Sequence, residues 1–170
     1  MSNGFNGIDK NKAHEKAVAL IPETFFWSSI DDLAPFGSDE GYTALVEYRE
    51  WRMTHPDCPT LECLQWVIES VGEMTFADYN ENLLSPQLIA EQIADDDFDD
   101  QQYIYTLDVS IIATGFGQLV DEGNIDAANK RIIRIAVERQ LVWSGLQQGW
   151  TYATDYIANL EVLRRVLEQA

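Results

Sequence analysis

The segment from residue 101 to residue 120, QQYIYTLDVSIIATGFGQLV, holds one charged residue, Asp108, in a chain that is otherwise rich in carboxylates. Its apolar residues cover more than one helical face, and one stripe of them consists of Ile104, Leu107, Ile111 and Leu119. A helix that is apolar all round belongs in a protein core or in a membrane. Asp108 and the neighbouring Gln, Thr, Ser and Gly residues argue against a membrane span. We therefore predict a buried central helix over residues 99–122.

The helix-capping and helix-ending residues in the rest of the chain predict further helices and little or no β-sheet. Caps, prolines and glycines separate periodic apolar segments, which predict helices at about 9–20, 38–53, 59–71, 85–93, 126–146 and 154–168. A chain of 170 residues with a hydrophobic content of 46% has enough apolar surface for one core. The predicted fold is all-α: a single-domain bundle of six or seven helices over residues 9–170, built around the central helix. A polar, flexible N-terminal tail is expected over residues 1–8.

The formal net charge is −18, and it is distributed unevenly along the chain. Residues 1–94 hold 16 acids and 5 bases, residues 95–123 hold 8 acids and no base, and residues 124–170 hold 5 acids and 6 bases. Such a charge repels nucleic acids and anionic membranes, and it attracts basic partners and cations. The C-terminal third is the natural counter-charge inside the fold, and its basic centre consists of Lys130, Arg131, Arg134 and Arg139.

Asp108 is expected to have a cationic partner, because an isolated buried charge is strongly unfavourable. If the 99–122 and 126–146 helices pair antiparallel about Gly123, Asp108 lies near the level of Arg139, with Arg134 about one turn along. We therefore predict a structural ion pair of Asp108 with Arg134 or Arg139. A catalytic carboxylate with a perturbed pKa and a side chain that reaches solvent are the two alternatives.

Aromatic residues are concentrated in the segment 21–41, IPETFFWSSIDDLAPFGSDEG. They are expected to cover the end of the bundle, because exposed aromatics in this number would form a large apolar patch. The residues in question are Phe25, Phe26, Trp27 and Phe36. If they proved to be exposed and contiguous, they would form a binding surface instead.

The same segment contains four carboxylates that are candidate ligands for a divalent metal: Asp31, Asp32, Asp39 and Glu40. Carboxylate oxygens are the ligands that Ca²⁺ and Mg²⁺ prefer. The ordered spacing of an EF-hand is absent, however. Ser38 followed by two acids also fits a helix N-cap with negative charge in the first turn, which is a purely structural use.

The run from residue 21 to residue 51, IPETFFWSSIDDLAPFGSDEGYTALVEYREW, resembles a segment of bacterial cytoplasmic proteins of the YfeS-like kind. The resemblance covers about 30 of the 170 residues. It implies a bacterial protein, but it implies no established catalytic activity and adds no site residue.

Few catalytic arrangements are open to a chain with two histidines and two cysteines. Glu-x-x-His, His-Glu-x-x-His, Gly-x-Ser-x-Gly and the P-loop pattern are all missing. The acidic run DDDFDD at 95–100 lacks the glycine and glutamate of an EF-hand. Cys58 and Cys63 have no second pair to complete a zinc site and are expected to be reduced thiols. No cofactor is predicted, and the sequence favours a protein that is not an enzyme.

These observations favour an acidic protein–protein interaction module, such as an immunity or inhibitor protein that covers a basic partner. The alternative is a metal-binding protein or enzyme that uses the carboxylates of the 31–40 loop. We expect no binding to nucleic acid or membranes. The N-terminal sequence has no apolar run typical of a signal peptide, and no later segment looks like a membrane span, so a cytoplasmic location is expected.

Overall fold

The computed structural model describes residues 7–170, and all of its regular structure is helical. The α-helices are α1 (Glu15–Leu20), α2 (Asp39–Thr54), α3 (Leu61–Val71), α4 (Pro86–Ala94), α5 (Leu107–Glu122), α6 (Lys130–Leu146) and α7 (Ala153–Gln169). Short 3₁₀ turns connect several of them, and no strand occurs between residues 7 and 170. The predicted all-α class is confirmed.

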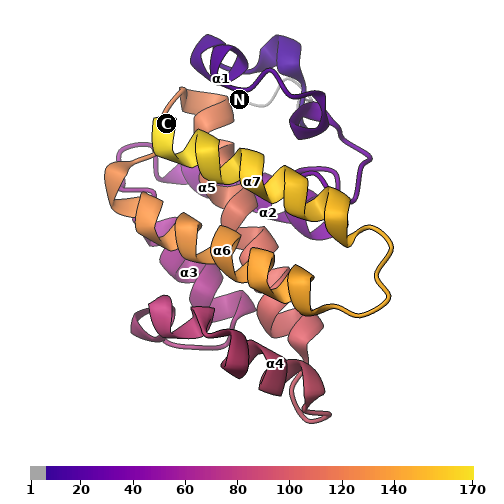
Figure 1. Cartoon of the computed structure of the whole chain (residues 1–170). Coiled ribbons are helices and arrows are strands. Elements are labelled where there is room, and N and C mark those ends of the chain that lie inside the picture. The colour runs from indigo at the N-terminus through magenta and orange to yellow at the C-terminus, as the bar shows by residue number, and fades with distance from the viewer. Residues whose placement is uncertain (1–6) are drawn as a thin grey trace.

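The helix α5 runs through the middle of the bundle (Figure 1). α2, α3 and α6 pack directly against it, and α7 packs against α6. In Figure 1, α1 lies across one end of the bundle and α4 lies at the other. The helix expected to be central from its apolar sequence is therefore central in space.

Every residue of α5 from Leu107 to Val120 is buried. The hydroxyl groups of Ser110 and Thr114 donate to the backbone oxygens one turn back, at 2.7 and 2.8 Å, so they leave no unpaired donor in the core. A π-helical segment, Gln101–Thr106, precedes α5, which corrects the prediction of one regular helix from residue 99.

Among the described helices, none combines the length and the apolar character needed to cross a membrane.

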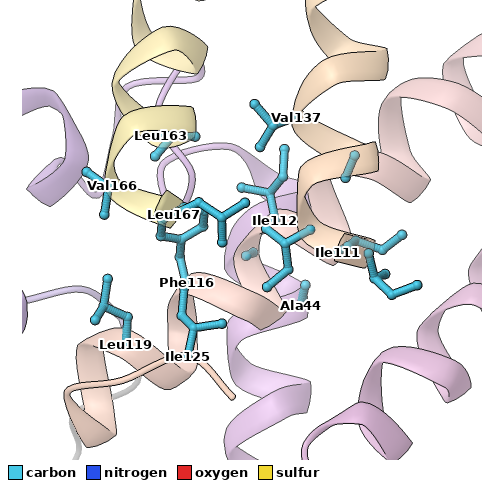
Figure 2. Packing of buried hydrophobic residues seen from close by; sticks show 14 of the residues in the cluster. Ala44, Ile111, Ile112, Phe116, Leu119, Ile125, Val137, Leu163, Val166 and Leu167 are labelled. Atoms are coloured by element: carbon cyan, nitrogen blue, oxygen red, sulfur yellow. The ribbon is translucent and has the colours of Figure 1, made fainter. Parts of the chain in front are cut away.

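Figure 2 shows how side chains of four helices meet in the core. The α5 side chains point toward apolar side chains of α2, α6 and α7. The labelled members of this cluster include Ala44, Ile111, Ile112, Phe116, Val137, Leu163, Val166 and Leu167. Burial of these groups is the main driving force for folding.

Two glycines of α5 allow the neighbouring helices to approach closely. A Cβ atom on Gly115 would collide with the end of the Ile133 side chain on α6. A Cβ atom on Gly117 would lie 3.1 Å from Leu45 Cδ1 and 3.3 Å from Tyr48 Cδ2, both on α2. The Gly-Phe-Gly sequence therefore serves helix packing on two sides of α5.

The helix boundaries follow the predicted caps with one correction. Ser38 Oγ accepts from the Gly41 amide at 3.1 Å, and Gly123 ends α5 with φ of 83°. The single helix expected at 9–20 is divided into a 3₁₀ turn, Lys10–Lys12, and α1. The division arises because the amide of His14 donates to the carbonyl of Val120 on α5, at 2.8 Å, and not to its own helix.

The expected tail over residues 1–8 lies partly outside the described residues, which begin at Gly7. Within the described part, Ile8 is only 8% exposed and belongs to the main apolar cluster. Arg49 Nη1 donates to the carbonyl of Gly7 at 2.8 Å. The last two residues of this segment, Gly7 and Ile8, therefore contact the bundle, and a flexible tail before them stays a prediction.

The aromatic segment 21–41 lies over the core, as expected. Phe26 and Phe36 are fully buried and meet edge-to-face at 5.4 Å, and Phe26 also contacts Phe116 of α5 at 6.0 Å. Phe25 and Trp27 are half-buried and pack against the same core. The aromatics therefore do not form an exposed binding patch.

The buried carboxylate of Asp108 on α5 meets the guanidinium of Arg139 on α6. Arg139 Nε and Nη2 donate to the two carboxylate oxygens at 2.9 Å each, and the two side chains are 0% and 2% exposed. Tyr79 Oη and Gln140 Nε2 also donate to Asp108, at 2.7 and 3.0 Å. Burial raises the pKa of Asp108, and these donors oppose that rise.

Arg134, the other predicted partner of Asp108, does not take part in this pair. Five residues separate Arg134 from Arg139, which places them about 140° apart around a helix of 3.6 residues per turn. Arg134 is half-buried and lies beside Glu138, Glu161 and Glu168 on the outer side of α6 and α7. The linear distance along the helix was therefore a poor guide to which face each arginine occupies.

We expect Asp108→Ala to lower the free energy of unfolding by about 3–5 kcal/mol, because it leaves the Arg139 cation buried without its partner. Asp108→Asn is expected to cost less, since the amide oxygen still accepts from Arg139. Urea melts of the two variants beside the parent protein give both values. An Asp108→Ala protein as stable as the parent would contradict the structural role of the pair.

Candidate cation-binding cleft

A cleft of about 560 Å³ opens where four separate parts of the chain converge. One side is formed by the loop before α2 and by the first turn of that helix. The others are formed by the π-helical segment before α5, the end of α6, and the 147–152 link to α7. We call it the aromatic–acidic cleft, after its principal side chains: Asp32, Asp39, Glu40, Tyr105, Trp143, Trp150, Tyr152 and Tyr156.

Aromatic rings form a continuous wall of the cleft. Tyr105 contacts Trp143 at 5.5 Å between ring centroids, Trp143 contacts Trp150 at 6.0 Å, and Trp150 contacts Tyr156 at 5.5 Å. Trp143 and Tyr156 are almost fully buried, whereas Tyr152 at the rim is 58% exposed. The wall therefore combines rings that are held by contacts with one another and one exposed ring at the rim, Tyr152.

Three carboxylates also line the cleft: Asp32, Asp39 and Glu40. The Ser38 cap places Asp39 and Glu40 in the first turn of α2, where the positive end of the helix dipole favours negative charge. Asp32 lies in the preceding loop, and like Asp39 it is exposed to solvent. None of the ion pairs formed by the described residues includes Asp32, Asp39 or Glu40.

The phenol of Tyr105 lies within electrostatic reach of all three carboxylates. Burial raises the pKa of Tyr105 to about 12, and the negative charges of Glu40, Asp32 and Asp39 contribute to that rise. Tyr105 therefore carries an uncharged phenol at the pH of any ordinary buffer. The same field that disfavours a phenolate favours a cation.

Hydrogen bonds fix the base of the cleft to the core. Trp143 Nε1 donates to Asp100 Oδ2 at 2.9 Å, and Tyr156 Oη donates to Gln140 Oε1 at 2.7 Å. Gln140 in turn donates to Asp108, which belongs to the buried ion pair. The aromatic wall is thus preorganised by the polar centre of the protein.

The metal site considered from the sequence is not formed. Residues 7–170 contain no group of three or more His, Cys, Asp or Glu side chains that could hold a metal ion. Asp31 does not line the cleft, and its Oδ1 accepts from the Leu33 amide at 2.9 Å. Asp32, Asp39 and Glu40 line the cleft without converging on one point. Local density of carboxylates in the sequence was therefore not a sufficient signal for a metal.

The cysteines and histidines have structural positions. Cys58 and Cys63 are free thiols, and burial raises the pKa of Cys63 to about 12, which makes it a poor nucleophile. His14 Nδ1 accepts from the Lys16 amide at 3.1 Å as the cap of α1. The His55 ring stacks on Trp51 at 4.9 Å.

The aromatic half of the cleft was missed by sequence reasoning. The available signal was the density of aromatic residues after α6, where Trp143, Trp150, Tyr152 and Tyr156 fall within 14 residues around Gly145 and Gly149. Pattern alone does not show that this segment folds back onto the loop before α2, which lies more than 100 residues earlier in the chain.

Comparison with known proteins adds no homologue to this description. No protein-family model matches the chain, and neither a curated protein nor a solved structure does. The cleft is therefore interpreted from its own geometry and charge.

Glu40→Gln is expected to lower the pKa of Tyr105 while leaving it above the usual value near 10, because burial remains the larger cause. Because folding raises the pKa of the Tyr105 phenol, the protonated phenol contributes to the free energy of unfolding. This contribution is complete below pH 10 and is lost as the pH rises through about 12. NMR titration of a ¹³Cζ-labelled tyrosine, assigned with Tyr105→Phe, gives the pKa directly. Glu168→Gln, an exposed site outside the cleft, is the matched control and should leave the titration unchanged.

Proposed function

We propose that the protein is an acidic interaction module that binds a basic partner protein, and that the aromatic–acidic cleft receives a lysine or arginine side chain of that partner. The observation that carries the proposal is that three carboxylates and several aromatic rings line the same open cleft. A cation between them gains both Coulomb attraction and contact with ring faces.

The internal ion pairs support this proposal because they leave the cleft without a counter-charge. Six arginines pair with carboxylates elsewhere in the described chain: Arg49, Arg52, Arg131, Arg139, Arg164 and Arg165. No arginine or lysine lines the cleft. A cation from a partner is therefore the natural complement to Asp32, Asp39 and Glu40.

The overall charge supports a protein partner of opposite sign. With a net charge of −18, the chain attracts basic proteins over long range and accelerates their association at low salt. An immunity or inhibitor protein that covers a basic toxin or enzyme is the type of module that fits this charge. The resemblance of residues 21–51 to YfeS-like proteins favours a bacterial source, and we propose the cytoplasm as the compartment.

The test uses tetralysine and tetra-arginine peptides as probes, with tetraglutamate as the negative probe. Tryptophan fluorescence and calorimetry at 20 and 200 mM salt report binding. We expect saturable binding of both cationic peptides that quenches tryptophan emission and weakens with salt. Asp32→Asn/Asp39→Asn/Glu40→Gln in one protein should weaken binding at least about tenfold, since each lost ionic contact removes attraction.

The matched control removes two aspartates and one glutamate at exposed positions outside the cleft: Asp57→Asn/Asp78→Asn/Glu69→Gln. This protein loses as much overall charge as the cleft variant, but it should bind within about twofold of the parent, because its substitutions lie outside the cleft. Tyr152→Ala tests the aromatic contribution and should weaken binding without unfolding, since this ring is 58% exposed. Equal weakening by the two triple variants would show non-specific charge attraction and would refute the cleft as the binding site.

A further inference from the structure

A second cavity, of about 330 Å³, lies between the residues that follow α3, the end of α4 and the π-helical segment. It shares no lining residue with the aromatic–acidic cleft. Its walls are mainly apolar, and the one cationic side chain in its lining is Arg139, so we call it the Arg139 cavity. The residues that matter here are Met74, Leu83, Phe98, Tyr103, Gln92 and Arg139.

Arg139 is unusual because a fully buried guanidinium retains an unused donor. Nε and Nη2 make all of its hydrogen bonds within residues 7–170: to Asp108, and from Nη2 to the carbonyl of Tyr103 at 2.9 Å. The ring of Tyr79 covers one face of the guanidinium, at 5.5 Å from Cζ. Nη1 has no hydrogen-bond partner among the described residues, and the side chain, 2% exposed, forms part of the cavity lining.

Nη1 is not among the buried side-chain atoms that lack a partner, so it is accessible, and water or a ligand acceptor can meet it. The five N–H groups of a guanidinium lie in one plane, and here the edges with Nε and Nη2 are occupied. The remaining edge is the one available to the cavity. The cavity therefore combines an apolar wall with a fixed, charged hydrogen-bond donor, which is the usual composition of a small-molecule site.

The charges around the cavity select against an anionic ligand. Asp108 already neutralises Arg139, and Glu73 at the cavity mouth adds a further negative charge, its carboxylate accepting from Tyr103 Oη at 3.0 Å. A ligand carboxylate would meet this excess of negative charge. A neutral carbonyl oxygen accepts from Nη1 without that repulsion.

The geometry points to a second binding site, in which the Arg139 cavity holds an uncharged, largely apolar small molecule whose carbonyl oxygen accepts a hydrogen bond from Arg139 Nη1. The apolar body of the ligand lies against Met74, Leu83 and Phe98. The site is independent of the proposed binding of a basic partner, since it has neither the position nor the charge of the aromatic–acidic cleft.

Three probes of similar size separate the parts of this proposal without any change to the protein. Acetophenone carries the neutral carbonyl, ethylbenzene lacks an acceptor, and benzoate carries a negative charge. Binding is followed in the full chain by the methyl NMR signals of Met74 and Leu83. We expect acetophenone to shift both signals saturably and to bind about tenfold or more tightly than ethylbenzene, because its oxygen gains a hydrogen bond from a charged donor. Benzoate should bind more weakly than acetophenone.

Leu83→Trp fills the cavity and should abolish the acetophenone-induced shift of the Met74 methyl. Ile30→Trp, at a position that is 87% exposed, introduces the same side chain outside the cavity and should leave binding unchanged. Thermal melts verify that each variant folds. If Leu83→Trp does not fold, Met74→Trp takes its place, and the acetophenone-induced shift is then followed at the Leu83 methyl. Equal affinity for acetophenone and ethylbenzene would overturn the role of Arg139. Tighter binding of benzoate than of acetophenone would overturn the charge argument. Unchanged acetophenone binding by the folded Leu83→Trp or Met74→Trp protein would overturn the site itself.

Discussion

Two charged groups, Asp108 on α5 and Arg139 on α6, meet in the interior of a bundle whose other central contacts are almost all apolar. Burying them is tolerable because both carboxylate oxygens accept hydrogen bonds: Oδ1 accepts from Tyr79 and Arg139, and Oδ2 accepts from Gln140 and Arg139. A shift of α6 along α5 by one turn would separate the charges and leave both without partners. The pair therefore fixes the register between the two helices more sharply than apolar packing does, because apolar contacts are non-directional.

The polar centre also supports both candidate sites. From Asp108 the hydrogen bonds continue through Gln140 to Tyr156, a ring of the aromatic wall. On the other side, Arg139 reaches the carbonyl of Tyr103 and the base of the second cavity. Side chains that must present a ring face or a donor in a defined direction are thus held by buried bonds and not by mobile surface residues. Two carboxylates of the cleft, Asp39 and Glu40, lie instead in the first turn of α2, which the local Ser38 cap begins.

The sequence predicted those features that depend on local chemistry. Periodicity and caps located α2, α3, α4, α6 and α7 to within a few residues and the end of α5 at Glu122. The lone charge of residues 101–120 implied a buried partner, of which Arg139 was one of two candidates. The choice between Arg134 and Arg139 depends on rotation about α6, which spacing along the chain does not give. The cleft could not be predicted, because its rings and acids come from segments that meet only after folding. The carboxylates of 31–40 were considered both as metal ligands and as a helix cap with its first-turn acids. Three of them line the cleft, and no group of three that could hold a metal ion forms among residues 7–170.

The close approach at Gly115 has a consequence for how this sequence is free to change over evolution. The space that a Cβ atom would need there is occupied by Ile133 of α6. At Gly117 the fit is tight but less so, because Leu45 and Tyr48 of α2 lie just over 3 Å from the position of a Cβ atom. A larger residue at 115 is compatible with the fold only if residue 133 becomes smaller in the same lineage. Residues 115 and 133 are therefore expected to vary as a pair among descendants of this chain. The size of a side chain on α5 is thus limited separately by α6 at residue 115 and by α2 at residue 117.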